Sequence, residues 1–337
     1  MNTLEDHTQE VEMLTLVKPY VVSLCIMEHR ALFGIVDARG SILNSDSVLM
    51  ADYPDPSSFV FDVCDRLVPM MEQCGGIEKI KAMGISTCSG NNRSGCIESP
   101  ANLDWKGNIP LAKMFQGSLG LPVTLQNDAT TAAQGEAVFG AAHGLQNFVA
   151  VYINAGLGAG IYVNNAVVRG YNGRVGEIGH VTIFPGGRPC GCGKVGCLES
   201  YVSQRGILMN LQDMLKAHPE VNTTLRDIPM AALKVEDVVE AAEAGDRLAL
   251  AVFRYTGNLL GKALVPTASF INPEAFILCG WVGSLCGKFM QRAVLEALNE
   301  ELFAQMKWKT RVLVSHLDLN EAPLLYASAE AWNSKGF

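Results

Sequence analysis

Three cysteines and one histidine form the most chemically specific pattern in this sequence. Cys190, Cys192 and Cys197 fall within eight residues, and His180 lies ten residues before the first of them. Glycines between the cysteines let the backbone turn tightly enough for three thiolates to converge on one ion. Sulfur and imidazole donors favour zinc, and four protein ligands leave no open position for a catalytic water. The spacing therefore predicts a structural zinc knuckle. A disulfide or a reactive thiol pair is the alternative, and one residue between two cysteines gives it poor bridging geometry.

A second candidate is Asp128, which stands where a predicted strand is followed by a predicted helix. A carboxylate at such a junction can be an N-cap, which accepts hydrogen bonds from the first helical turn. It can equally be a functional group, because α/β folds bind ligands at the carboxyl ends of their strands. From the position of Asp128 alone, both interpretations stay open.

Length and charge restrict the class of protein. A chain of 337 residues is long enough for two domains that each bury a core. The formal net charge of −8 argues against a nucleic-acid-binding surface. Residues 1–18 carry four acidic side chains and no long apolar run, so they predict a short tail and neither a signal peptide nor a membrane helix. Ten cysteines without such a signal indicate free thiols in a reducing cytoplasm. We therefore expect a cytoplasmic protein without nucleic-acid or membrane partners.

The order of apolar segments predicts an α/β protein with mixed sheets. A strand meander followed by helices occurs twice, which indicates two related halves. The segment 88–107 is rich in Gly, Ser, Asn and Pro and is predicted to be a binding loop. The expected strands are 20–26, 31–36, 41–50, 81–87, 122–126, 148–153, 160–163, 166–169, 275–279 and 312–315. The expected helices are 57–74, 129–139, 198–217, 235–269, 288–305 and 321–333.

Several motifs together resemble the ROK family of sugar kinases and sugar-responsive repressors, which belongs to the actin-like ATPase superfamily. The signature is EIGH at 177–180 followed by PCGCGKVGCLE at 189–199. Further matches are SPANLDWKG at 99–107, NDATTAAQGE at 127–136 and INPEAFIL at 271–278. The resemblance implies an α/β fold of two ribonuclease-H-like domains with a hexose bound in the central cleft between them.

The same resemblance implies roles for individual residues. Asp128 matches the catalytic base that accepts the proton of a sugar hydroxyl as it attacks the γ-phosphate of ATP. One ring nitrogen of His180 would bind zinc while the other meets the sugar. We place the two domains at 19–128 with 320–337 and at 129–319, and the family implies a homodimer and a hexose or N-acetylhexosamine ligand. The positions that match sugar contacts are Asn102, Asn127, Asp128, Glu177, His180 and Glu199.

The nucleotide side departs from the family pattern. Family kinases begin with Asp-x-Gly-Gly-Thr-Lys, where this chain has CIMEHR at 25–30, with Glu28 in the place of a phosphate contact. The second phosphate loop, usually Gly-Thr-Gly, reads Asn-Ala-Gly at 154–156. Near the adenosine, paired glycines become Cys-Gly-Trp at 279–281, and Tyr326 replaces a glycine of the last helix. Glycine backbone and positive charge are what a phosphate needs.

These departures favour a kinase-like protein that binds a hexose and has weak or absent ATP-dependent phosphorylation. The alternative is an active ATP- and Mg²⁺-dependent hexose kinase that uses Asp128 as general base. In that case the remaining nucleotide contacts would be Arg30, Gly156, Gly158 and Gly280. A sugar-responsive transcriptional regulator is a third reading. Only about twenty residues precede the first predicted strand, which we expect to be too few for a DNA-binding domain.

Overall fold

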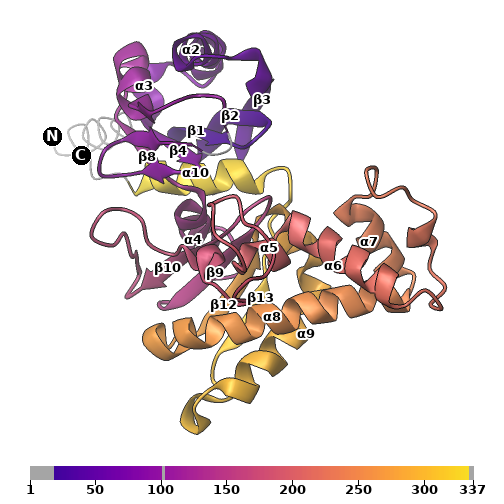
Figure 1. Cartoon of the computed structure of the whole chain (residues 1–337). Helices are drawn as coiled ribbons and strands as arrows, with labels where there is room; N and C mark the ends of the chain where they lie inside the picture. The colour runs from indigo at the N-terminus through magenta and orange to yellow at the C-terminus, as the bar shows by residue number, and fades with distance from the viewer. Residues whose placement is uncertain (1–18, 101–102, 334–337) are drawn as a thin grey trace, which may run out of the picture. The chain divides into compact units, whose positions relative to one another are not determined.

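The computed structural model describes residues 19–100 and 103–333 (Figure 1). The tail predicted at 1–18 and the sugar contact predicted at Asn102 lie outside the described residues. The chain divides into two compact units, one formed by the described parts of Met1–Thr131 and Glu321–Phe337 and the other by Ala132–Asn320. No helix in the described ranges has the length and apolar character needed to cross a membrane.

The first unit is built on a five-stranded mixed sheet whose strand order is β3-β2-β1-β4-β8. Strands β1, β2 and β3 form an antiparallel meander, and β4 and β8 run parallel to β1. The strands are β1 (Tyr20–Ile26), β2 (Arg30–Asp37), β3 (Ile42–Leu49), β4 (Ile80–Thr87) and β8 (Val123–Asn127). The helices are α2 (Pro56–Gln73), α3 (Leu111–Leu119) and α10 (Ala322–Trp332).

Helix α10 packs directly on the backbone of β4. A Cβ at Gly84 would lie 2.1 Å from the carbonyl oxygen of Ala327, so only glycine permits this approach. The hydroxyl of Ser23 on β1 donates to the carbonyl oxygen of Leu324, also on α10. The C-terminal helix is therefore held against the central strands of the first sheet.

The second unit repeats the topology of the first, with strand order β11-β10-β9-β12-β13. Strands β9, β10 and β11 form the antiparallel meander, and β12 and β13 run parallel to β9. This repetition confirms the two related halves expected from the sequence. The strands are β9 (Phe148–Ile153), β10 (Leu157–Val163), β11 (Ala166–Val167), β12 (Ala275–Cys279) and β13 (Arg311–Val314). The helices are α5 (Glu199–Val202), α6 (Gln204–Ala217), α7 (Val235–Glu243), α8 (Arg247–Ile271) and α9 (Gly280–Glu301), and α4 (Asp128–Val138) leads into this unit.

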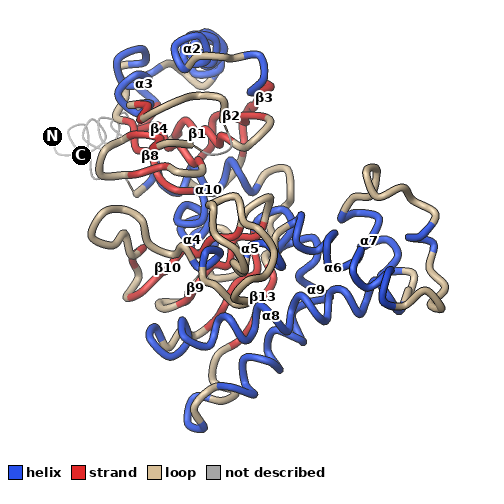
Figure 2. The backbone as a smooth tube through the Cα atoms, viewed as in Figure 1, coloured by secondary structure: helices blue, strands red, loops and turns tan. Residues whose placement is uncertain are grey.

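Several elements differ from the expectations (Figure 2). The helix expected at 235–269 is two helices, α7 and α8, with a break at 244–246. The predicted loop 88–107 contains short strands β5 (Gly90–Asn91) and β6 (Cys96–Glu98), which form a small sheet with β7 (Asn108–Ile109) around the buried Ile97. Helix α3 was not predicted. Helix α9 begins at residue 280, eight residues before the predicted start. The helix predicted at 198–217 is two helices, because Ser203 takes an extended conformation and caps α6.

Candidate functional site

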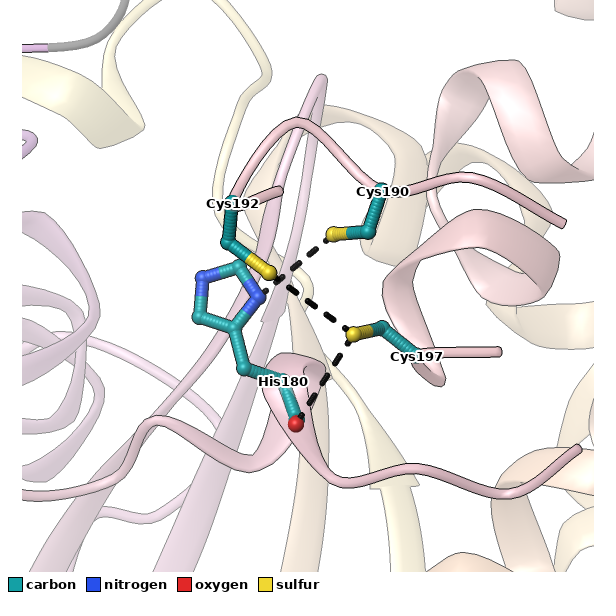
Figure 3. Close-up of side chains that lie close together, drawn as sticks. All are labelled: His180, Cys190, Cys192 and Cys197. Atoms are coloured by element: carbon teal, nitrogen blue, oxygen red, sulfur yellow. Dashed lines mark hydrogen bonds between the residues drawn. The ribbon is translucent and has the colours of Figure 1, made fainter. Parts of the chain in front are cut away.

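The four predicted metal ligands converge in the second unit (Figure 3). His180 ends the 3-10 helix η3 (Ile178–His180), and the cysteines lie on residues 188–199, which we call the metal loop. Their ligand atoms all lie within 4.8 Å of one another. The Nδ1 atom of His180 is 3.7 Å from the Sγ atom of Cys190, and the Sγ atoms of Cys192 and Cys197 are 3.8 Å apart.

The distances of 3.7 and 3.8 Å are close to those around one tetrahedral ion. Zn–S bonds of about 2.3 Å and Zn–N bonds of about 2.0 Å at tetrahedral angles place two sulfurs about 3.8 Å apart and a sulfur and a nitrogen about 3.5 Å apart. The thiol environments differ: burial raises the pKa of Cys190 to about 12, whereas a hydrogen bond from the backbone N–H of Lys194 lowers the pKa of Cys192. Lowering a thiol pKa favours the thiolate that binds metal. The donor set therefore fits a borderline divalent metal such as zinc.

The same region gathers three of the predicted sugar contacts. The Nδ1 atom of His180 faces the cysteines, and its Nε2 atom is 3.9 Å from a carboxylate oxygen of Glu177. One carboxylate oxygen of Glu199 lies 3.4 Å from the Sγ atom of Cys190. The other accepts a hydrogen bond of 3.0 Å from the backbone N–H of Leu157, at the start of β10. Glu177, His180 and Glu199 are thus brought together around the cysteine cluster.

Asn127 ends β8 in the first unit, and Asp128 is the first residue of α4. The Oδ1 atom of Asn127 accepts hydrogen bonds from the backbone N–H groups of Ala129 and Thr130, at 3.0 and 3.4 Å. Asn127 therefore provides most of the capping of α4, the role considered above for Asp128, although Asp128 Oδ1 also accepts from Ala129 N–H at 2.9 Å. The carboxyl group of Asp128 is half-buried.

Two cysteines lie close to the carboxylate of Asp128. Burial is the main reason why the pKa values of Cys25 and Cys88 are raised to about 12, and the negative charge of Asp128 adds to the shift at both. Glu28 adds further to the shift at Cys88. Asp128 and Glu28 thus add negative charge near these two cysteines, and Arg30 partly offsets it at Cys25.

The turn at residues 27–30, which the motif resemblance aligns with a phosphate contact, is a tight hairpin. Met27 N–H donates to Arg30 O at 2.9 Å, so only Glu28 and His29 form the tip, and both are exposed. Arg30 begins β2 and pairs with Leu49. A pocket of about 510 Å³ lies beside this turn, and its described lining residues include no lysine or arginine. They are Glu28, His29, Leu49, Met50, Ala51, Tyr53, Leu103, Asp104 and Trp105.

The corresponding turn of the second unit is closed by hydrogen bonds within the chain. Asn154 N–H donates to Gly156 O at 2.9 Å, and Asn154 Oδ1 accepts from the Trp281 N–H at the start of α9. Gly280 has a φ of +78°, and a Cβ there would lie 2.8 Å from a backbone oxygen. Gly158 is a ladder residue of β10. Gly280 therefore has a structural reason to be glycine, apart from any contact with a nucleotide.

Gly179 is a site residue that the sequence reading did not single out. It lies inside the EIGH motif, and a Cβ there would lie 2.2 Å from the carbonyl oxygen of Leu157. The 3-10 helix that carries His180 thus rests backbone to backbone on β10. The sequence did carry a signal for this contact, because a glycine stands directly before the candidate metal ligand His180.

The sequence profile of the ROK family matches residues 25–329. The chain belongs to the ROK family. The match includes the second sheet, the first sheet except most of β1, Asp128 and the metal loop, so it confirms the resemblance carried by the motifs.

Named relatives of this ROK protein include glucokinases. That of Streptomyces coelicolor is 32% identical over 251 residues, which cover 73% of this chain and 77% of that protein. That of Halalkalibacterium halodurans is 37% identical over 190 residues, which cover 56% of this chain and 57% of that protein. The crystal structure of a ROK family glucokinase from Streptomyces griseus in complex with glucose and AMPPNP has a TM-score of 0.80 and 29% identity, covering 94% of this chain and all (100%) of that one. The structural likeness extends over nearly the whole ROK chain.

Proposed function

We propose that this ROK protein binds a hexose through Glu177, His180 and Glu199, with Asn102, Asn127 and Asp128 as further contacts. The observation that carries the proposal is the position of Glu199, whose carboxylate is held beside the cluster of metal ligands by a hydrogen bond from Leu157 N–H. A carboxylate whose position is fixed can distinguish the stereochemistry of sugar hydroxyls. The likeness to a glucokinase crystallised with glucose supports the same ligand class.

Zinc held by His180, Cys190, Cys192 and Cys197 would stiffen this site, and with four protein ligands it supplies structure and no bound water. With Nδ1 turned to the metal, His180 is left with Nε2 for a second partner. That nitrogen is on the side of Glu177. The tautomer and the ring orientation of His180 would then be fixed together.

Phosphoryl transfer is proposed to be weak or absent. Transfer requires backbone N–H groups, metal and positive charge around the phosphates. The hairpin tip instead carries Glu28, and the pocket beside it is lined by Glu28 and Asp104. In the second unit, Asn154 already uses the Trp281 N–H at the start of α9. These features disfavour a triphosphate at both turns.

An active ATP-dependent hexose kinase is the second candidate, and the capping of α4 favours it. Asn127 accepts hydrogen bonds from Ala129 and Thr130, and Asp128 accepts only from Ala129, so most of the capping does not need a carboxylate at 128. Asp128 would then be the general base, with Mg²⁺-ATP as the phosphoryl donor.

The deciding experiment measures ADP release with Mg²⁺-ATP and a panel of glucose, mannose, fructose, N-acetylglucosamine and N-acetylmannosamine. Asp128→Asn is the matched control, because it removes the basic carboxylate and keeps the side-chain size. Thermal unfolding with each sugar is followed in parallel. No ADP release with any sugar, together with a rise in Tm on addition of one of them, supports hexose binding without phosphoryl transfer. Turnover that disappears in Asp128→Asn establishes the active kinase, and no response to any sugar in either assay refutes hexose binding.

A further inference from the structure

Arg188, the first residue of the metal loop, makes an unusual number of contacts for a charged side chain. Only 13% of its side chain is exposed. Its Nη1 atom donates to Ser200 O at 3.1 Å, to Asn210 Oδ1 at 2.8 Å and to Gly206 O at 3.4 Å. Its Nη2 atom lies 2.7 Å from a carboxylate oxygen of Asp213. A guanidinium with this many fixed acceptors is rigidly placed.

These contacts close the base of the metal loop. The loop starts at Arg188 and ends at Glu199, and the Nη1 bond joins Arg188 to the residue directly after that end. The backbone also closes here, since Gly196 N–H donates to Arg188 O at 2.8 Å, and the Ser200 hydroxyl donates to Pro189 O at 3.1 Å. The position of Cys190 relative to Glu199 therefore depends on Arg188.

The guanidinium is in turn anchored to the interior of the second unit. It lies over the ring of Tyr201, 4.5 Å from the centroid. Its acceptor Asn210 is 1% exposed and donates to Tyr201 O and to the hydroxyl of Thr256 on α8, at 2.8 and 2.9 Å. Buried polar networks of this kind fix one arrangement when every member is satisfied. The anchor of the loop thus extends through α6 to α8.

We infer that Arg188 is the positioning residue of the metal loop: it holds Cys190 in place as a metal ligand and Glu199 in place as a hexose contact. The guanidinium contacts hold residues 188 and 200 together, and the metal ligands Cys190 and Cys197 lie two and three residues inside that closure. The part of this inference that concerns hexose rests on the proposed function, and the part that concerns the metal does not.

The test uses the full chain with Arg188→Lys, which keeps the charge and loses the planar fork and the ring stacking. Two variants serve as controls. Asp213→Asn removes the negative charge of the exposed partner and keeps a side-chain oxygen that can accept from Arg188. Arg226→Lys alters another arginine of the same unit, one that donates to the carbonyl oxygens of Leu215, His218 and Val221 away from the metal loop.

Each protein is stripped of metal and titrated with Co²⁺, whose visible absorption reports thiolate number and tetrahedral geometry. We expect Arg188→Lys to lose about tenfold in Co²⁺ affinity, the lower end of the range for residues that orient metal ligands, and to shift the absorption bands. Asp213→Asn and Arg226→Lys should match the wild type. Equal affinity and equal spectra in Arg188→Lys and the wild type would overturn the inference, as would the same loss in Arg226→Lys.

The hexose part is read from the sugar-induced rise in Tm of the metal-loaded proteins. We expect this rise to be reduced in Arg188→Lys and kept in both controls. A wild type that responds to no sugar refutes the proposed function, while the Co²⁺ titration still decides the role of Arg188. A wild type and an Arg188→Lys variant that respond equally to sugar overturn the positioning of Glu199.

Discussion

Replacing Gly179 by alanine tests whether β10 fixes the metal-binding histidine. A Cβ at this position would lie 2.2 Å from the carbonyl oxygen of Leu157 and 3.1 Å from its Cβ. Leu157 cannot yield easily, because it pairs with Ile153 in the β9–β10 ladder. The 3-10 helix that carries His180 must therefore move away from the strand.

The size of that movement follows from the contact distances. An ordinary contact begins at 3.4 Å, so a shift of about 1 Å is needed, and overpacking of this kind typically costs about 1–3 kcal/mol. Metal binding tolerates a smaller shift than the fold does, because metal–ligand distances must stay within about 0.2 Å of their usual values. The Nδ1 atom of His180 is 3.7 Å from Cys190 Sγ, and its displacement should weaken metal binding more than it weakens the fold.

The assay combines urea denaturation of the metal-free protein with Co²⁺ titration. The matched control is Gly191→Ala on the metal loop, where a Cβ meets nothing within 4 Å and φ is not positive. We expect Gly179→Ala to lose stability and at least about tenfold in Co²⁺ affinity, and Gly191→Ala to change little. If the two alanine variants behaved alike, the contact with β10 would not position His180.

Three further predictions follow from single contacts. Cys192→Ser should lower Tm and metal affinity together, because metal binding is coupled to folding of its site, and excess chelator should bring wild type and variant to the same Tm. Asn154→Ala should cost about 1 kcal/mol in urea denaturation by removing the acceptor for Trp281 N–H, whereas Asn154→Asp should retain it; equal losses would contradict the capping role. Two backbone N–H groups donate to Glu274 and lower its pKa below the usual 4.5. The stability that Glu274 supplies is therefore present above pH 4.5 and lost as pH falls through the lowered pKa, so the deficit of Glu274→Gln at pH 7 should shrink at pH 3.

The sheets could be read from the sequence because their strands are apolar runs bounded by turns. The segments 20–26, 148–153 and 275–279 were predicted with the bounds that the structure shows. The predicted helix started eight residues later than α9 because the first turns of α9 are rich in glycine, which usually weakens a helix. Those glycines have a packing role: a Cβ at Gly287 would lie 2.7 Å from the side chain of Val314. Local propensity was overridden by a tertiary contact that the sequence does not show.

The candidate site was predictable only where its residues are close in the chain. The spacing of the cysteines indicated the metal ligands directly. The anchors of Arg188 were missed because Asn210 and Asp213 lie 22 and 25 residues further along, on a helix with no sequence signal toward the loop. The homodimer and the domain bounds stay predictions, as does the sugar contact at Asn102.

Glu199 is the residue that connects the metal loop to the sheet. One of its oxygens lies beside Cys190 and the other accepts the N–H of Leu157. A carboxylate has about four lone-pair sites, so each oxygen has the capacity for one more donor after these contacts. A sugar hydroxyl can therefore bind without displacing either contact. The Glu199 side chain loses little conformational entropy on binding, because its rotamer is already fixed. The start of β10 directly follows Gly156 of the second turn, where a Cβ would lie 3.1 Å from Glu199. A side chain added at Gly156 would thus press directly on the Glu199 carboxylate that is proposed to bind the sugar. This glycine belongs to the turn at 154–156, which differs from the family pattern Gly-Thr-Gly.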